Sequence, residues 1–179
     1  MSIAPPVRAG GLNRPPIVLV PACLRVLGDL PFLVAGRKYV DAVRLAGAVP
    51  LVVPAAQVDE LGTLLDVADG LLLTGSPSNV HPSHFGEDVH DPSLPLDPVR
   101  DEWTLPIIRE ALARGIRAKV FRRGIDPVEL YISVAGMSYF FFSNRLTLAS
   151  IFDRELQSAA AVSAYRAHVV AFAMAGLRV

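Results

Sequence analysis

Cysteine is almost absent from this chain of 179 residues, and the one thiol present, Cys23, has no partner for an intrachain disulfide. A single cysteine also excludes a cysteine-rich zinc site and an iron–sulfur cluster, because each needs several thiolate ligands. Scarce cysteine is typical of a reducing compartment, so the sequence predicts a cytoplasmic protein.

An excess of charge of either sign is also absent, because 17 Lys and Arg residues balance 17 Asp and Glu residues. Without a basic surplus, we expect no nucleic-acid partner. A chain without net charge has little electrostatic protection against self-association. Its hydrophobic content of 52% argues against disorder and for a folded core.

The sequence predicts neither a secretory signal nor a membrane partner. Residues 1–16 are rich in proline and glycine and lack an apolar core, so we expect a flexible arm there. The uncharged stretch Leu130–Asn144 is shorter than the roughly 20 residues that a bilayer span requires. A buried or interfacial helix is the better interpretation of that stretch.

The first part of the chain alternates between strand and helix patterns. Short aliphatic runs predict strands at Ile17–Val20, Val49–Val53 and Gly70–Thr74. Apolar residues at helical spacing predict helices over Arg37–Ala46 and Val58–Val67, and Pro21–Gly36 is expected to be a loop. This β-α-β-α-β order calls for a parallel, doubly wound α/β sheet.

A long polar loop is expected from Gly75 to Leu96, followed by a third helix. Asp97-Pro98 is a helix-start signal, with a capping side chain before proline at the first helical position. The pattern carries the helix toward Arg114, although Pro106 should kink or delay it.

The third aliphatic run stops abruptly at a polar loop of five residues: Gly75, Ser76, Pro77, Ser78 and Asn79. Ligands collect at the carboxyl ends of parallel strands, and hydroxyls beside backbone N–H groups can hold a carboxylate or an oxyanion. An ordinary turn uses the same residue types, and these residues alone favour the turn.

The wider context resembles one family. Four segments resemble the γ-glutamyl-γ-aminobutyrate hydrolases: Ala22-Cys23, Ala48-Val49-Pro50, the Gly75–Asn79 loop with His81-Pro82, and Asp97 to Asp101. These are peptidase C26 members of the class I glutamine amidotransferase-like proteins. The resemblance covers about residues 16–116. It implies a flavodoxin-like fold, a small γ-glutamyl ligand, and substrate or oxyanion binding by the Gly75–Asn79 loop.

The family's mechanism is acyl transfer by a cysteine, a histidine and a glutamate. Alignment with the family's nucleophile segment places Arg122 where that cysteine belongs. We expect no catalytic residue in this chain, because no later segment resembles the histidine and glutamate motifs. Cys23 follows a different strand and is interpreted as a small packed residue.

The resemblance implies that Arg25, Arg100 and Asp101 have counterparts in the family. An exposed surface arginine is an equal alternative for Arg25, and a charge pair at a helix start is an equal alternative for Arg100 and Asp101. His81 and His84 lie on a loop that does not fix ligand spacing, so we expect no metal site. No cofactor motif is present, and none is expected.

Beyond Ile125 the strand–helix alternation ends. Asp126-Pro127 predicts the start of an aromatic-rich helix, and a last helix is expected over Arg154–Leu177. The segments Ile125 to Ser133, Ser143 to Leu148 and Arg166 to Val170 resemble the C-terminal end of tetracycline-repressor-family regulators, whose last helices form a dimer interface. The aromatic residues of the first helix are interpreted as core or interface in preference to a ligand pocket.

The sequence therefore predicts an arm (1–16), a partial doubly wound, flavodoxin-like sheet (17–116) and an appended C-terminal helical hairpin (121–179). The leading interpretation is a hydrolase-like protein truncated before its nucleophile and inactive, which self-associates through its last helices. A fragment of a transcriptional regulator, acting in dimerisation or ligand sensing, is the alternative. A pseudogene product is a third, and the junction between Ile116 and Phe121 fits a fusion, a frameshift or an assembly artefact.

Overall fold

The computed structural model describes residues 14–179, which fall into two units. The first unit ends at Leu112, and the second is Ala113–Val179. The flexible arm expected over residues 1–16 lies almost wholly outside the described residues.

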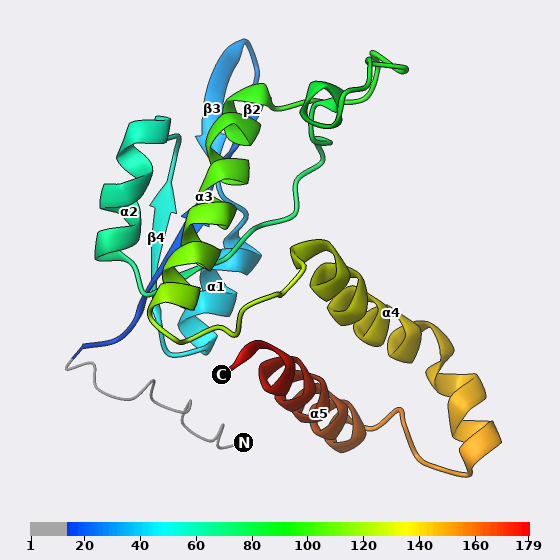
Figure 1. Ribbon diagram of the computed structural model, residues 1–179. Helices are drawn as coiled ribbons and strands as arrows, with labels where there is room; N and C mark the ends of the chain where they lie inside the picture. The colour runs from blue at the N-terminus through cyan, green and yellow to red at the C-terminus, as the bar shows by residue number, and fades with distance from the viewer. Residues whose placement is uncertain (1–13) are drawn as a thin grey trace. The chain divides into compact units, whose positions relative to one another are not determined.

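The first unit is built on a parallel sheet of three strands (Figure 1). Strand β1 (Ile17–Pro21) lies between β4 (Val49–Val53) and β5 (Gly70–Leu71). Leu19 is in register with Leu51 of β4 on one side and with Leu71 of β5 on the other. The first aliphatic run of the sequence is therefore the central strand, as burial on both faces requires.

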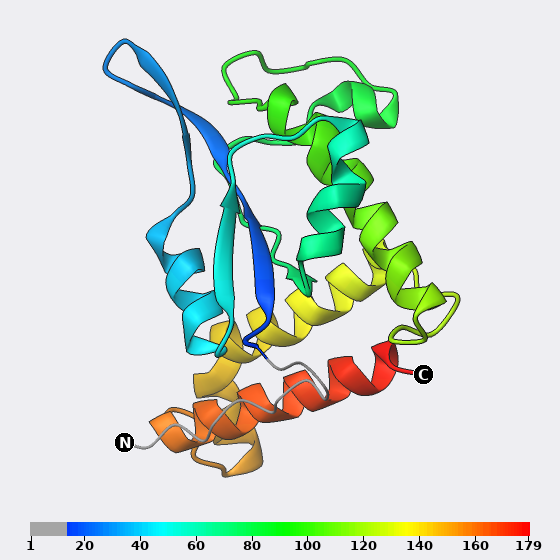
Figure 2. The ribbon, with the colours of Figure 1, turned by 90° about the vertical axis from the view of Figure 1, so that its left-hand side faces the viewer.

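Helices cover both faces of this sheet. Figure 2 shows helix α1 (Arg37–Leu45) on one face, with α2 (Leu61–Val67) and α3 (Pro98–Arg117) on the other. A short 3₁₀ turn, η1 (Val58–Glu60), leads into α2, and the Glu60 carboxylate accepts the N–H of Gln57 at 2.7 Å. The predicted doubly wound α/β fold is confirmed.

The core lies between the sheet and the α2–α3 layer. Leu19 of β1 and Trp103 and Ile107 of α3 are fully buried, and Val53 and Leu61 complete the cluster. Burying a side chain of this size contributes roughly 1.5–3 kcal/mol. This cluster fixes α3, and hence the residues at its N-terminus, against the sheet.

The prediction of a loop over Pro21–Gly36 was wrong, because this segment forms an antiparallel hairpin. Strands β2 (Cys23–Leu27) and β3 (Leu30–Val34) pair from Cys23 with Val34 to Leu27 with Leu30. Gly28 has a φ of 63°, which a two-residue hairpin turn requires and glycine adopts without strain. The residues taken as loop signals are therefore hairpin signals, and Figure 2 shows the hairpin projecting past the end of β4.

Two further boundaries differ from the predictions. The regular pairing of β5 ends at Leu71 instead of Thr74, although the N–H of Leu72 still donates to Leu19 at 2.9 Å. Helix α3 begins at Pro98 as predicted, but Pro106 lies inside it and does not delay it, and it continues to Arg117. Core packing of the residues around the proline outweighs the one hydrogen bond that the proline removes.

The second unit is a pair of helices, as expected of the helical hairpin. Helix α4 (Pro127–Phe152) begins at Asp126, whose carboxylate accepts the N–H groups of Val128 and Glu129. Helix α5 (Ala159–Leu177) begins five residues later than predicted, because Ser158 caps it.

The α4–α5 contact is mainly aromatic. The Phe141 and Tyr165 rings stack with centroids 3.9 Å apart, and the Tyr165 hydroxyl donates to the Met137 carbonyl at 3.0 Å. Of the aromatic residues predicted to be core or interface, Phe141 is buried, whereas Tyr131, Tyr139, Phe140 and Phe142 are exposed.

Over residues 14–179, α5 is the one helix long and apolar enough to cross a membrane by length and composition. None of its apolar window is buried. Arg166 lies near the middle of this helix, where a charge is costly in a bilayer.

Asp69 joins the start of β1 to the turn before β5. Its carboxylate accepts the Ile17 N–H at 2.8 Å and pairs with Arg14 at 2.6 Å. The Ile17 hydrogen bond, followed by the Arg14 contact, lowers the pKa of Asp69 below its ordinary value of 3.8. A lowered carboxyl pKa stabilises the folded state above the unfolded-state pKa, and this contribution is lost as the pH falls through the folded-state value.

We therefore expect Asp69→Asn to lower the free energy of unfolding by about 1 kcal/mol at pH 7. The difference from the unsubstituted chain should shrink as the pH falls below about 4. Urea unfolding at several pH values measures both, with Asp88→Asn as an exposed carboxylate control. A difference that stays constant down to the acid limit would contradict the assigned contacts.

Candidate functional site

The Gly75–Asn79 loop leaves the sheet at the carboxyl end of β5, beside the central strand. The Thr74 hydroxyl donates to the Pro21 carbonyl at 3.3 Å, so the chain stays along β1 until the loop begins. Gly75 is exposed, and Thr74 just before it is buried. The structure thus places this loop at the sheet edge where ligands collect.

The loop has internal order of its own. The Ser76 and Ser78 hydroxyls lie 2.8 Å apart, and the Ser78 N–H donates to the Ser76 hydroxyl at 3.3 Å. The Asn79 N–H donates to the Pro95 carbonyl at 2.9 Å, so the loop's far end is tied to the segment before α3. Both serine side chains are half-buried, whereas Pro77 and Asn79 are exposed.

The first turn of α3 holds both ends of the loop. The Arg100 guanidinium donates to the Thr74 carbonyl, and to the Thr74 hydroxyl at 3.2 Å. The Asp101 carboxylate, which is buried, accepts the His81 N–H at 2.8 Å. Because these partners lie on opposite sides of the loop, adjacent residues on one rigid helix set the distance between its ends.

Tyr39 of α1 contacts the same loop from the other face of the sheet. Its hydroxyl donates to the Gly75 carbonyl at 3.2 Å. A Cβ atom at Gly75 would lie 2.9 Å from that hydroxyl, so the close approach favours glycine there. The loop is therefore contacted by α1 and α3.

Asp97 connects the hairpin to this arrangement. Its carboxylate is 2% exposed and accepts the Leu24 N–H at 2.7 Å and the Arg100 N–H at 3.1 Å. The predicted helix cap thus has a second partner, at the start of β2. A buried carboxylate needs such donors, and removing them would leave a costly unpaired charge.

Arg25 is not brought to the loop by any contact in residues 14–179. It lies on β2, paired across the hairpin with Phe32, and its side chain is exposed. Cys23, at the start of the same strand, is half-buried, and its thiol contacts the Val34 carbonyl at 3.5 Å.

The predicted histidine positions carry local structure. The His81 ring accepts the Ser83 N–H at 3.3 Å and caps η2 (Pro82–Phe85). Within the part of the chain that the structure describes, no three His, Cys, Asp or Glu side chains converge as metal ligands.

Arg122, aligned with the family's nucleophile, lies in the turn between α3 and α4. Its N–H donates to the Leu177 carbonyl at the end of α5, at 2.9 Å. Lys119 and Gly124 on either side both have positive φ values, of 58° and 77°. The described residues from Ala118 to Asp126 contain no strand, so the position is not at the end of one.

The loop presents two half-buried hydroxyl groups, those of Ser76 and Ser78, at the carboxyl edge of the sheet. Over residues 14–179, the hydrogen-bond pattern places no thiol beside a base. Comparison with known proteins identifies the family of this chain. A family model described as Peptidase C26 matches residues 16–130, which is more than half of the chain.

The chain belongs to the peptidase C26 family. The γ-glutamyl-γ-aminobutyrate hydrolase of Escherichia coli is 35% identical to it over 123 residues, which is 68% of this chain and 47% of that protein. A putative glutamine amidotransferase of Mycobacterium tuberculosis is 29% identical over 125 residues, which is 67% of this chain and 40% of that protein. The chain thus spans about half the length, or less, of these curated relatives.

A second family model, described as the C-terminal domain of a tetracyclin repressor-like protein, matches residues 100–172. It overlaps the peptidase C26 match between residues 100 and 130. The resemblance of the helical tail to such regulators is therefore confirmed beside the family assignment.

Sequence reasoning missed Tyr39 and Asp97 as residues that position the loop. Tyr39 was predicted only to lie on the apolar face of a helix, and Asp97 only to cap one. In the structure, the Tyr39 hydroxyl also donates to the Gly75 carbonyl, and the Asp97 carboxylate also accepts the Leu24 N–H. The only signal in the sequence was a polar atom on a residue already explained by packing or capping, which does not specify a distant partner.

Proposed function

We propose that this chain is a γ-glutamyl-γ-aminobutyrate hydrolase-like protein that binds a small γ-glutamyl compound at the Gly75–Asn79 loop without hydrolysing it. The supporting observation is the attachment of both loop ends to α3, through Arg100 to Thr74 and Asp101 to His81. A preorganised loop loses less conformational freedom when a ligand binds, which favours affinity.

The ligand class follows from the family and from the loop's chemistry. Ser76, Ser78 and Asn79 supply hydroxyl, amide and backbone groups of the kind that hold a carboxylate or a carbonyl oxygen. The E. coli relative is named for its action on γ-glutamyl-γ-aminobutyrate, whose two carboxylates suit such groups. Arg25 and Arg100 carry the positive charge that would attract the ligand.

We propose no catalysis because the position aligned with the family's nucleophilic cysteine holds no nucleophile in this chain. Arg122 replaces the nucleophile and has no lone pair for attack at neutral pH. No cofactor is needed for binding alone, and the scarcity of cysteine supports a cytoplasmic location.

The test is calorimetric titration of the purified chain with γ-glutamyl-γ-aminobutyrate. We expect saturable binding that weakens at least about tenfold in the double variant Ser78→Ala, Asn79→Ala, because each lost hydrogen bond to a charged ligand is substantial. Ser150→Ala on α4 is the control and should bind normally. Equal binding by the loop variant and the parent would remove the loop from the proposal.

A second candidate, a self-associating regulator module, is favoured by the match of residues 100–172 and by the surface of the helical unit. Tyr131, Ile132 and Tyr139 of α4 are 73%, 62% and 76% exposed. Monomeric proteins seldom expose apolar patches of this kind over two helices. The unit also has a hollow of about 320 Å³ between the helices, lined by Leu130, Met137 and Phe172 among others.

For this candidate we expect the full chain to form a dimer through α4 and α5. The double substitution Ile132→Lys, Tyr139→Lys places two charges one heptad apart on α4 and should yield a monomer. Val58→Lys, at an equally exposed apolar position of the first unit, is the matched control and should remain dimeric. Light scattering measures all three, and a monomeric parent chain would contradict the prediction.

A further inference from the structure

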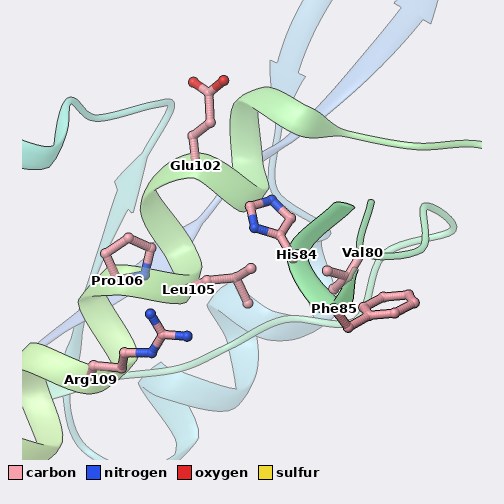
Figure 3. Close-up of a pocket in the computed structure, with 7 residues that line it drawn as sticks. All are labelled: Val80, His84, Phe85, Glu102, Leu105, Pro106 and Arg109. Carbon is pink, nitrogen blue, oxygen red and sulfur yellow. The ribbon is translucent and has the colours of Figure 1, made fainter. Parts of the chain in front are cut away.

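The outer face of α3 borders a hollow of about 280 Å³ in the first unit (Figure 3). Leu105, Pro106 and Arg109 line it from the helix, with Glu102 one turn nearer the N-terminus. Leu105 and Arg109 are four residues apart, so their side chains lie on the same face of the helix. The buried side chains that fix α3 against the sheet, Trp103 among them, lie on its other face, which leaves the outer face free to meet a ligand.

A cationic group points into the hollow from the helix side. Figure 3 shows the Arg109 guanidinium turned toward Leu105, whereas the Glu102 carboxylate points away from the other labelled side chains. Over residues 14–179, the Arg109 side chain forms no hydrogen bond and no ion pair, so its N–H donors remain available. The charge that the lining residues direct into the hollow is therefore positive.

The opposite wall is apolar and aromatic. Val80 and Phe85 lie across the hollow from the helix in Figure 3, and the His84 ring lies toward Leu105. Val80 and Phe85 are 41% and 63% exposed, so a ligand that covers them removes apolar surface from water. Small-molecule sites commonly combine an apolar lining with a few placed polar groups, and a guanidinium beside these side chains is such a combination.

Hydrogen bonds hold this wall against α3. The Asp101 carboxylate, in the first turn of α3, accepts the His81 N–H at 2.8 Å. The His84 N–H donates to the His81 carbonyl at 3.0 Å, and the Glu87 N–H donates to the Pro82 carbonyl at 3.1 Å, which closes the η2 turn. Because the two walls are tied together before a ligand arrives, binding costs less conformational freedom.

We propose that this hollow binds a small aromatic monocarboxylate. The carboxylate binds the Arg109 guanidinium, whose planar fork donates two parallel hydrogen bonds. The aromatic ring lies over Leu105, where the Phe85 ring and the His84 imidazole contact its edge or its face. A zwitterion is disfavoured, because its ammonium group would lie in the apolar part of the hollow without a carboxylate directed toward it.

This site is separate from the Gly75–Asn79 loop in position and in ligand. The loop leaves the sheet at the end of β5, whereas the hollow lies between η2 and the middle of α3. A γ-glutamyl compound carries an α-ammonium group, for which Figure 3 shows no carboxylate directed into the hollow. The inference therefore does not rest on the proposed loop function, and the double variant Ser78→Ala, Asn79→Ala should bind an aromatic monocarboxylate as the parent does.

The experiment follows backbone amide NMR shifts of the full chain during titration with phenylacetate. Shifts should map to residues 80–85 and 102–109. Phenylacetamide, which keeps the ring and lacks the charge, should bind at least about tenfold more weakly, because it loses the charge-assisted hydrogen bonds. Cyclohexylacetate, which keeps the charge and lacks the aromatic ring, should bind about threefold more weakly.

Arg109→Gln should weaken phenylacetate binding about tenfold or more and leave phenylacetamide binding within about twofold. Phe85→Ala should weaken the binding of both about threefold or more, because it removes part of the wall that covers the ring. Glu102→Gln is the matched control on the same helix and should change phenylacetate binding less than about twofold, because the Glu102 carboxylate points away from the hollow. Absence of binding, equal binding of phenylacetamide, or insensitivity to Arg109→Gln would each overturn the proposal, and equal binding of cyclohexylacetate would overturn its aromatic class.

Discussion

Purified chain is expected to release no γ-aminobutyrate from γ-glutamyl-γ-aminobutyrate above the uncatalysed rate. Acyl transfer of this kind needs a nucleophile within hydrogen-bond reach of a base. The position aligned with the nucleophile is Arg122, whose backbone is tied to the end of α5. Nucleophile loss typically lowers kcat by about a million-fold, because the catalytic residues act as a unit.

Two variants make this expectation specific. Cys23→Ser should change nothing, because over residues 14–179 the thiol hydrogen-bonds to the Val34 carbonyl and to no histidine. Arg122→Cys should not restore activity, because a thiol in this turn still lacks a base. The measurement is a coupled assay for released γ-aminobutyrate. Robust turnover by the parent chain that Cys23→Ser abolishes would make Cys23 a nucleophile and overturn the expectation.

The parts of the fold that the sequence predicted are those governed by local pattern. The boundaries of β4 were predicted without error, because an aliphatic run between turn residues specifies a buried strand. The β2–β3 hairpin was missed because Gly28 and Pro31 indicate an interruption of regular structure, which both a loop and a hairpin turn provide. Only the register between Leu27 and Leu30 shows that the break is a two-residue turn.

The sequence named the loop residues of the candidate site and two of the residues that hold the loop, but it did not indicate how they are arranged. For Arg100 and Asp101, a helix-start charge pair and a pair of family residues were equal alternatives, and nothing in the sequence indicated that they reach opposite ends of one loop. Long-range contacts depend on how α3 packs, and the fully buried Trp103 sets that packing. Pattern reasoning predicts which face of a helix is buried, and it does not specify which distant backbone group meets the first turn.

Gly115→Ala is expected to destabilise the helical unit by about 1–3 kcal/mol, although alanine favours helices over glycine. Gly115 lies in the last turns of α3, and a Cβ atom there would clash with Cδ2 and Cε2 of the Phe121 ring. The Val120 and Phe121 N–H groups both donate to the Gly115 carbonyl, at 2.9 and 3.1 Å. These bonds hold the Phe121 backbone beside Gly115, so the clash is relieved only if the ring leaves its rotamer or the turn opens.

Gly136→Ala provides the matched control, because Gly136 also lies inside a helix but a Cβ atom there would meet no atom within 4 Å. It should stabilise the unit by about 0.4–1 kcal/mol, chiefly by restricting the unfolded chain. Urea unfolding followed by circular dichroism measures both variants, and adding Phe121→Ala to Gly115→Ala should remove the steric part of the penalty. If Gly115→Ala proved as stabilising as Gly136→Ala, Phe121 would not pack on Gly115. The packing of Phe121 against Gly115 would then not determine the turn in which Arg122 lies.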